Sequence, residues 1–227
     1  MAHANGRRAL IVQGGWDGHE PKQVADIFER ELTARGFEVE VADTLEAFRT
    51  TDLTKLSLIV PVWTMSSITG EQLQPVLDAV RGGVGLAGCH GGMCDAFRES
   101  TEWQWMTGGQ WVAHPGDDGT EYTVQITQPD HFITAGAPAE FAVKSEQYYL
   151  HTDPSNNVLA VTRFPVADGP HTPNGPFEMP QIWTQLWGQG RVYYNALGHH
   201  ADIVAQPDIL PLMVRGLLWA AQAEEAA

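Results

Sequence analysis

The chain has 227 residues, 43% of them hydrophobic, and carries a formal net charge of −15 at pH 7. This length suits one domain of the larger kind with an ordinary hydrophobic core, which excludes disorder of the whole chain. The negative charge argues against nucleic acids and anionic membrane surfaces as partners, because both are bound through Lys and Arg side chains.

The first ninety residues alternate between apolar runs and amphipathic segments. Arg8–Gly14 is an apolar run ending in glycine, typical of a strand buried on both faces. Glu20–Arg35 has apolar residues at helical spacing, with Pro21 suited to its first turn and Gly36 to its end. Further strands are predicted at Glu38–Ala42, Leu56–Trp63 and Val84–Cys89, and a further helix at Glu71–Val80. This order predicts an α/β fold with a mainly parallel sheet flanked by helices.

The character of the sequence changes after about residue 100, where Trp, Gly and Pro become dense. Short alternating segments predict strands at Glu121–Thr127, Gln147–His151, Val158–Phe164 and Arg191–Leu197, followed by a helix from about Pro207 to Ala220. Because no repeat or linker-like stretch interrupts the chain, we expect residues 1–227 to form a single domain. Ligands of open α/β sheets bind at the carboxyl ends of the strands, so we expect the functional site there.

Cellular location is indicated by weaker signals. The two cysteines, Cys89 and Cys94, provide no disulfide framework. No apolar signal segment precedes the first predicted strand, and the apolar run Ile209–Ala221 is interrupted by Arg215 and too short to span a bilayer. We therefore expect a reduced, cytoplasmic protein.

The first polar loop at a predicted strand end is Gly14–Pro21. Trp16 offers a flat apolar face that can stack on a sugar ring, and Asp17 can accept hydrogen bonds from hydroxyl groups. The structural alternative is a tight turn in which His19 or Glu20 caps the following helix. The GxGxxG pattern is absent, so we expect no nucleotide cofactor.

The second loop, Gly88–Met93, follows a buried strand and resembles the sharp turn of a nucleophile elbow. Cys89 could be a nucleophile activated by a nearby histidine, or His90 could act as a base or a metal ligand. The structural alternative is a small buried Cys89 beside a polar His90 in a turn.

Three later segments add candidate site residues. Trp111 and His114 lie in a Gly- and Trp-rich loop that could form an aromatic wall or seal the core. Glu146 starts an apolar aromatic strand that contains Tyr148, and it could be a partly buried carboxylate with a raised pKa. The alternative is that Glu146 pairs with an arginine or caps a loop. His199 follows the predicted strand that ends at Gly198.

Three of the histidines share a position at predicted strand ends, namely His19, His90 and His199. Histidine suits both proton transfer near neutral pH and transition-metal binding, so these residues are candidate ligands of a divalent metal such as zinc. Sequence spacing does not bring them together; only the fold can do so.

Five segments, in this order, resemble the ThuA-like (trehalose utilisation) family. They are GGWDGHEP, GCHGG, GGQWVAHPG, DHFITAG with SEQYY, and WGQGRVYYNALGHH. The resemblance implies a flavodoxin-like sheet of the class I glutamine amidotransferase superfamily. It also implies a role in sugar catabolism beside dehydrogenases that make 3-keto-glycosides.

The function predicted from these features is a sugar-catabolic enzyme that cleaves or rearranges 3-keto-glycosides by acid–base or metal-assisted chemistry. Its predicted catalytic residues are His90, His199 and Glu146, and its predicted substrate-binding residues are Trp16, Asp17, Trp111, His114 and Tyr148. One alternative is a hydrolase or amidase that uses Cys89, as the amidotransferase relationship suggests. Another is a non-catalytic sugar-binding module. The expected partner is a small sugar, and the many tryptophans would fit a homodimer.

Overall fold

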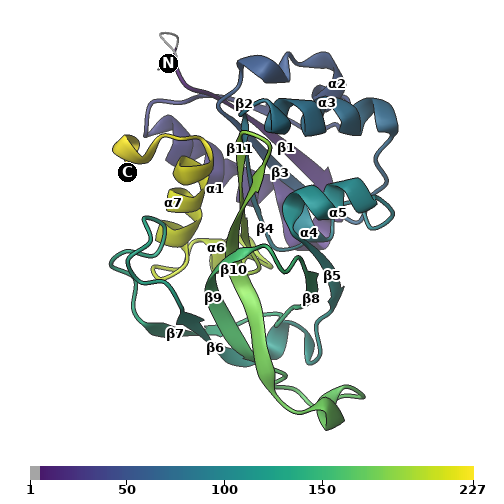
Figure 1. Ribbon diagram of the computed structural model, residues 1–227, viewed down its shortest axis with the longest axis vertical. Helices are drawn as coiled ribbons and strands as arrows, with labels where there is room; N and C mark the ends of the chain where they lie inside the picture. Colours follow the sequence, from purple (N-terminus) through teal and green to yellow (C-terminus); the bar gives the residue numbers. More distant parts are fainter. Residues whose placement is uncertain (1–5) are drawn as a thin grey trace.

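A nine-stranded mixed sheet forms the centre of the computed structural model, which describes residues 6–227 (Figure 1). Its strands are β1 (Arg8–Gly15), β2 (Glu38–Ala42), β3 (Leu58–Thr64), β4 (Gly85–Cys89), β6 (Glu121–Ile126), β7 (Glu140–Lys144), β9 (Asn157–Phe164), β10 (Phe177–Trp187) and β11 (Gly190–Asn195). Their order across the sheet is β2-β1-β3-β4-β11-β10-β9-β6-β7.

The sheet has a parallel half and an antiparallel half. The pairs β2–β1, β1–β3, β3–β4 and β4–β11 are parallel. From β11 outward, through β10, β9, β6 and β7, every pair is antiparallel. A second sheet of two antiparallel strands, β5 (Gly109–Ala113) and β8 (Tyr149–Thr152), lies beside the first.

Helices cover both faces of the parallel half (Figure 1). On one face lie α1 (Pro21–Thr33) and α7 (Leu210–Ala220), and on the other α2 (Ala47–Thr50), α3 (Gly70–Arg81) and α5 (Thr101–Thr107). Successive side chains of β1 point to opposite faces, as the period of a strand requires. Ile11 therefore packs with the α1 and α7 core, whereas Leu10 packs with the α2 and α3 core.

Two short helices begin next to strand ends. They are α4 (Gly91–Cys94), which follows β4, and α6 (Ala201–Val204), which follows β11. The loop after β1 is joined to α6 by a hydrogen bond, because the Ala201 N–H donates to the Glu20 carboxylate at 2.9 Å. The carboxyl ends of β1, β4 and β11 are thereby held close to one another.

The predicted α/β fold with helices on both faces is confirmed, and the predicted strands and long helices are present with small changes at their ends. The sequence prediction missed β5, β7 and β10. The longest of these, β10, has a register irregularity after Pro180, which removes the regular alternation that identifies a strand. Among the helices of residues 6–227, none combines the length and the apolar character that crossing a bilayer requires.

Candidate functional site

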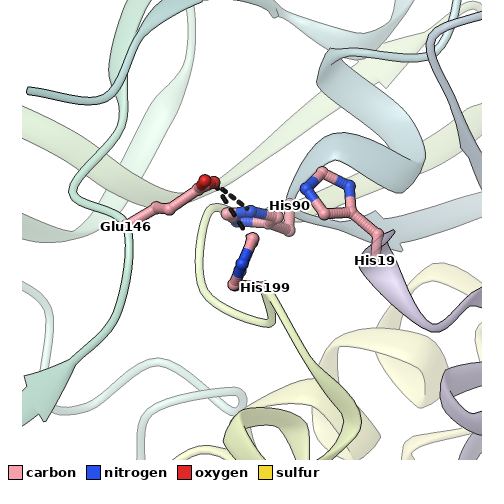
Figure 2. Close-up of side chains that lie close together, drawn as sticks. All are labelled: His19, His90, Glu146 and His199. Carbon is pink, nitrogen blue, oxygen red and sulfur yellow. Dashed lines mark hydrogen bonds and ion pairs between the residues drawn. The ribbon is translucent and has the colours of Figure 1, made fainter. Parts of the chain in front are cut away.

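Four buried side chains meet near the carboxyl ends of β1, β4 and β11 (Figure 2). Each offers one possible ligand atom, and these atoms all lie within 4.8 Å of one another. The exposed fractions are 8% for His19, 1% for His90, 7% for Glu146 and 5% for His199. The histidines follow strands of the parallel half, as their sequence positions predict, whereas Glu146 lies between β7 and β8. We call these residues the four-residue cluster.

His90 owes its position to a sharp turn between β4 and α4. Its backbone angles are φ 47° and ψ −140°, a region that costs a residue other than glycine about 1–3 kcal/mol. The turn also needs a small residue at Gly92, where an added Cβ would lie 3.1 Å from the Cα of Val62. A strained residue between a strand and a helix projects its side chain above the sheet, as in a nucleophile elbow. Here that side chain is the imidazole of His90.

Cys89 does not occupy the elbow position that its motif suggested. It is the last residue of β4, only 4% exposed, and its side chain belongs to the hydrophobic core. Burial raises the pKa of the Cys89 thiol to about 12, so the nucleophilic thiolate is scarce near neutral pH. Cys94 is also a free, buried cysteine. The geometry therefore favours the alternative in which Cys89 is a small core residue.

The hydrogen bonds of His90 define which of its nitrogens carries a proton. Its Nδ1 lies 2.8 Å from the carbonyl oxygen of Ala196, which can only accept, so Nδ1 must donate. In the neutral ring the lone pair is then on Nε2, which lies 3.0 Å from Oε2 of Glu146. Burial lowers the pKa of His90 although Glu146 opposes the shift, so the neutral form prevails. Without a cation two electron pairs would face each other here, so either a proton or a metal ion must lie between Nε2 of His90 and the carboxylate of Glu146.

Glu146 places the same oxygen against a second histidine. Nδ1 of His199 is 3.2 Å from Oε2 of Glu146, yet within residues 6–227 this nitrogen has no partner at hydrogen-bond geometry. Burial by itself raises the pKa of Glu146, but its contacts with His199 and His90 outweigh burial and hold the pKa well below its usual range. The carboxylate is therefore ionised, and one of its oxygens is shared by two imidazoles.

His19 completes the cluster from the loop after β1. Its Nδ1 lies 2.9 Å from the hydroxyl of Thr64, which leaves Nε2 available. Burial, together with repulsion from His90 and His199, lowers the pKa of His19 to about 2, so the ring is neutral at pH 7. The ring also packs closely on Gly91, where an added Cβ would lie 2.5 Å from Cε1 of His19.

These donors fit a divalent transition-metal ion. Neutral imidazoles and a carboxylate are ligands of zinc and similar ions, at metal–ligand distances of about 2.0–2.2 Å that put adjacent ligand atoms about 3.0–3.4 Å apart. The contacts from Glu146 to His90 at 3.0 Å and to His199 at 3.2 Å lie in this range. Other ligand atoms of the cluster are as much as 4.8 Å apart, which exceeds both the spacing of adjacent ligands and the about 4.2 Å between ligands on opposite sides of one ion. Binding would therefore draw the most distant side chains together by roughly 0.6 to 1.4 Å.

Tyr148 and Trp111 form an aromatic wall beside the cluster. The Tyr148 ring stacks on His90, with ring centroids 3.9 Å apart and an angle of 25° between the planes. Trp111 lies 6.2 Å from Tyr148, and the guanidinium of Arg98 lies 4.4 Å from the Trp111 ring centroid. Both predicted substrate-binding aromatics of this part of the chain are therefore close to the cluster.

His114 lies between the cluster and solvent. Its Nε2 is 3.6 Å from Oε1 of Glu146, and its side chain is 29% exposed. Its Nδ1 lies 3.1 Å from Oδ1 of Asp117, which the backbone turn from His114 to Asp117 brings back over the ring. When Nδ1 donates to Asp117, the lone pair is on Nε2, the nitrogen that faces the cluster.

The two predicted substrate-binding residues of the first loop have different surroundings. Trp16 is 46% exposed, and its ring meets His19 edge-on at 4.8 Å. Asp17 lines a separate cleft, together with Gln13, Gly14 and Trp63. The geometry thus places Trp16 at the border of the four-residue cluster and Asp17 beside a different hollow.

Sequence reasoning gave Thr64 and Asp117 no individual role, although the polar loop Thr64–Ser67 follows a predicted strand and was expected to border the site. Thr64 is the last residue of β3 and is 2% exposed, so its position at a strand end was the available signal. Asp117 follows His114-Pro115-Gly116, and a Pro-Gly pair is a turn signal that folds the next residue back.

Comparison with known proteins agrees with the fold and the motifs. The sequence matches one family model, described as trehalose utilisation (ThuA), over residues 8–220. No functionally curated protein matches it significantly.

Solved structures share the fold at low sequence identity. A protein described as ThuA-like from Bacteroides uniformis has 17% identity and a TM-score of 0.78, over 97% of this chain and 93% of that one. Another from Parabacteroides merdae has 18% identity and a TM-score of 0.73, over 96% and 90%. A β-galactosidase from Bacillus circulans sp. alkalophilus has 13% identity and a TM-score of 0.63, over 97% of this chain but 31% of the galactosidase. Because the family model spans nearly the whole described chain, the protein belongs to the ThuA family.

Proposed function

We propose that the protein is a sugar-processing enzyme whose catalytic centre is a divalent transition-metal ion held by His19, His90, Glu146 and His199. The observation that carries this proposal is the convergence of these buried donors. The lowered pKa values of His19, His90 and Glu146 support it, because metals bind neutral histidine and ionised carboxylate. The family description, trehalose utilisation, supports a sugar as the substrate.

The substrate class we propose is a glycoside oxidised to a ketone at C3. The ketone acidifies the proton on C2, so a base can remove it, and the C1–oxygen bond then breaks as a C1–C2 double bond forms. The departing oxygen takes up a proton and leaves as an alcohol. A bound divalent ion would polarise the ketone oxygen and stabilise negative charge that develops on it.

His114 is the proposed base. Its Nδ1 lies within hydrogen-bond distance of Asp117, and its Nε2 faces Glu146 of the cluster. A base must lie within hydrogen-bond reach of the proton that it removes. His114 is partly exposed beside Glu146, so its ring can meet a sugar that approaches from solvent. His90, His199 and Glu146, which we predicted to be catalytic, act in this scheme through the ion that they hold.

The aromatic side chains around the cluster would hold the sugar ring. Trp16 and Trp111 lie at the border of the cluster, next to His19 and His114 respectively. Tyr148 stacks on the imidazole of His90 and so holds that ring in place. The role proposed for Asp117 is to orient the ring of His114 through the contact with Nδ1, and Asp117 is not one of the four cluster residues.

Elemental analysis of protein purified without added metal tests the proposal, combined with turnover of 3-keto-trehalose. We expect close to one transition-metal ion per chain in the wild type, and loss of both metal and turnover in His90→Ala. Cys89→Ser is the matched control in the same turn, and it should keep both.

Each other outcome has a definite meaning. Stoichiometric metal and sugar binding without turnover of any keto-glycoside would favour a sugar-binding module over an enzyme. Turnover that survives chelation and His90→Ala would overturn the metal centre. Loss of turnover in Cys89→Ser, with the metal retained, would instead favour the alternative of a hydrolase that uses Cys89 as its nucleophile.

A further inference from the structure

A second hollow lies outside the four-residue cluster, at the carboxyl ends of β1, β2 and β3. It is a cleft of about 430 Å³, bordered by Gln13, Gly14 and Asp17 from the end of β1 and the loop after it. Asp43, the residue after β2, and Trp63 of β3 line it as well, from the two strands that flank β1.

The strand order shows that the cleft lies where the topology of the sheet reverses. The chain runs from β1 to β2 on one side of β1, and then returns to place β3 on the other side. The topology therefore reverses at β1 and β3, and open α/β sheets bind ligands in the crevice at such a switch point. The cleft lies at this point and extends toward β2, whereas the four-residue cluster extends from the same point toward β4 and β11.

The lining of the cleft selects a neutral ligand rich in hydroxyl groups. Asp17 and Asp43 can accept hydrogen bonds from hydroxyls and would repel a phosphate. The lysine at the border, Lys22, is already paired with Asp26 through contacts of 2.9 and 2.8 Å. Two carboxylates and one lysine thus line the cleft, which gives its lining a net negative charge.

Trp63 supplies the aromatic surface. It is partly exposed, and its ring packs over Gly14, where an added Cβ would lie 2.7 Å from the ring. The buried indole N–H of Trp63 has no hydrogen-bond partner in residues 6–227. A flat ring beside carboxylate acceptors is the combination that binds sugar rings, through stacking of C–H groups and hydrogen bonds to hydroxyls.

We propose that this cleft is a second binding site, specific for a neutral saccharide unit. It is independent of the metal centre, although the two sites adjoin. Trp63 borders the cleft while its neighbour Thr64 bonds to His19 of the cluster. Asp17 and His19 belong to one short turn of the chain. Asp17 lines the cleft and His19 belongs to the cluster, so this turn lies between the two sites and contributes a residue to each.

The test is a titration of uniformly ¹⁵N-labelled protein with trehalose, followed through the indole N–H resonances of tryptophan. The His90→Ala variant is used so that turnover does not interfere. We expect trehalose to shift the Trp63 resonance, and Asp17→Ala and Asp43→Ala to weaken its binding about tenfold or more, the factor typical of a lost hydrogen bond to a charged group. Trp63→Phe should weaken binding as well, with thermal melting used to check that it folds.

Matched controls lie far from the cleft. Asp208→Asn alters an exposed carboxylate and Trp105→Phe an exposed tryptophan, and both should leave trehalose binding unchanged. A shift confined to Trp16 or Trp111 would assign the sugar to the four-residue cluster and overturn the proposal. So would absence of binding at tens of millimolar trehalose, or a Trp63 response to inorganic phosphate alone. Metal content and turnover play no part in this assay, so its failure is distinct from failure of the proposed enzyme.

Discussion

The two halves of the sheet contribute to the site in different ways. The parallel half provides three histidines, each just beyond a strand end, as open α/β sheets generally place their ligands. The antiparallel half provides one residue of the cluster, Glu146, from the loop between β7 and β8. The parallel half thus supplies imidazole nitrogens, and the antiparallel half adds a carboxylate. The complete set of three imidazoles and one carboxylate therefore exists only where the two halves of the sheet meet.

The largest expected effect is on the parallel half. Replacing His90 with Ala removes a ligand and should lower turnover by about 10³-fold or more, since metal-dependent charge stabilisation is lost. Cys89→Ala, one residue earlier in the same turn, should change kcat/KM by less than about threefold and lower the free energy of unfolding by about 1 kcal/mol. Steady-state kinetics and urea unfolding measure both. Equal losses of activity would mean that the turn, and not the imidazole, matters.

The antiparallel half is tested by Glu146→Gln, which keeps the shape of the side chain and removes its charge. We expect metal affinity and turnover to fall by about 100-fold, because a neutral amide is a poor ligand for a transition metal. Glu140→Gln, an exposed carboxylate of the neighbouring β7, is the control. Metal affinity is measured by competition with a chelating dye, and an unchanged value would reduce Glu146 to a structural partner of His90 and His199.

The contact between loop and turn in the parallel half is tested by Gly91→Ala. The added methyl would meet His19 at 2.5 Å, so the imidazole must move. We expect metal affinity to fall about 10- to 100-fold, with a loss of about 1–3 kcal/mol of unfolding free energy from overpacking. Gly70→Ala, where a Cβ meets nothing within 4 Å, is the matched control. Retained affinity would show that His19 is not needed to hold the ion.

The smallest expected effect concerns the hydroxyl that orients His19. Thr64→Val keeps the shape of the side chain but removes the contact of 2.9 Å to Nδ1. Loss of such an outer partner typically lowers metal affinity about 10-fold or somewhat more. Thr54→Val, at an exposed threonine, should have no effect. A change as large as that of Glu146→Gln would mean that Thr64 does more than orient the ring.

Sequence reasoning was strongest for the parallel half. Apolar runs and helical periodicity predicted β1, β2, β3, β4, α1 and α3, and the strand-end rule predicted that His19, His90 and His199 would gather. That rule works because parallel strands end at one edge of the sheet. The catalytic and substrate-binding roles stay predictions until activity is measured.

Other features depend on geometry that local sequence does not encode. The motif around residue 90 indicated a sharp turn, but only the backbone angles show that His90 and not Cys89 occupies its strained position. The contact of Glu146 with two histidines joins residues 53 and 56 positions apart, so no spacing pattern reveals it. The strand β10 was missed because a proline and a register shift hide its alternation.

The four residues of the cluster are far apart in the sequence, and this spacing affects the stability of the protein. Its members stand at positions 19, 90, 146 and 199, so no fragment of the chain carries a complete set, and an unfolded chain should bind an ion only weakly. A ligand that binds the folded state alone adds about 4 kcal/mol of stability when its free concentration is a thousand times Kd. For a chain of this length that corresponds to a rise of about 8–16 °C in Tm. Metal supply would then govern how long the protein resists proteolysis, apart from any effect on its chemistry.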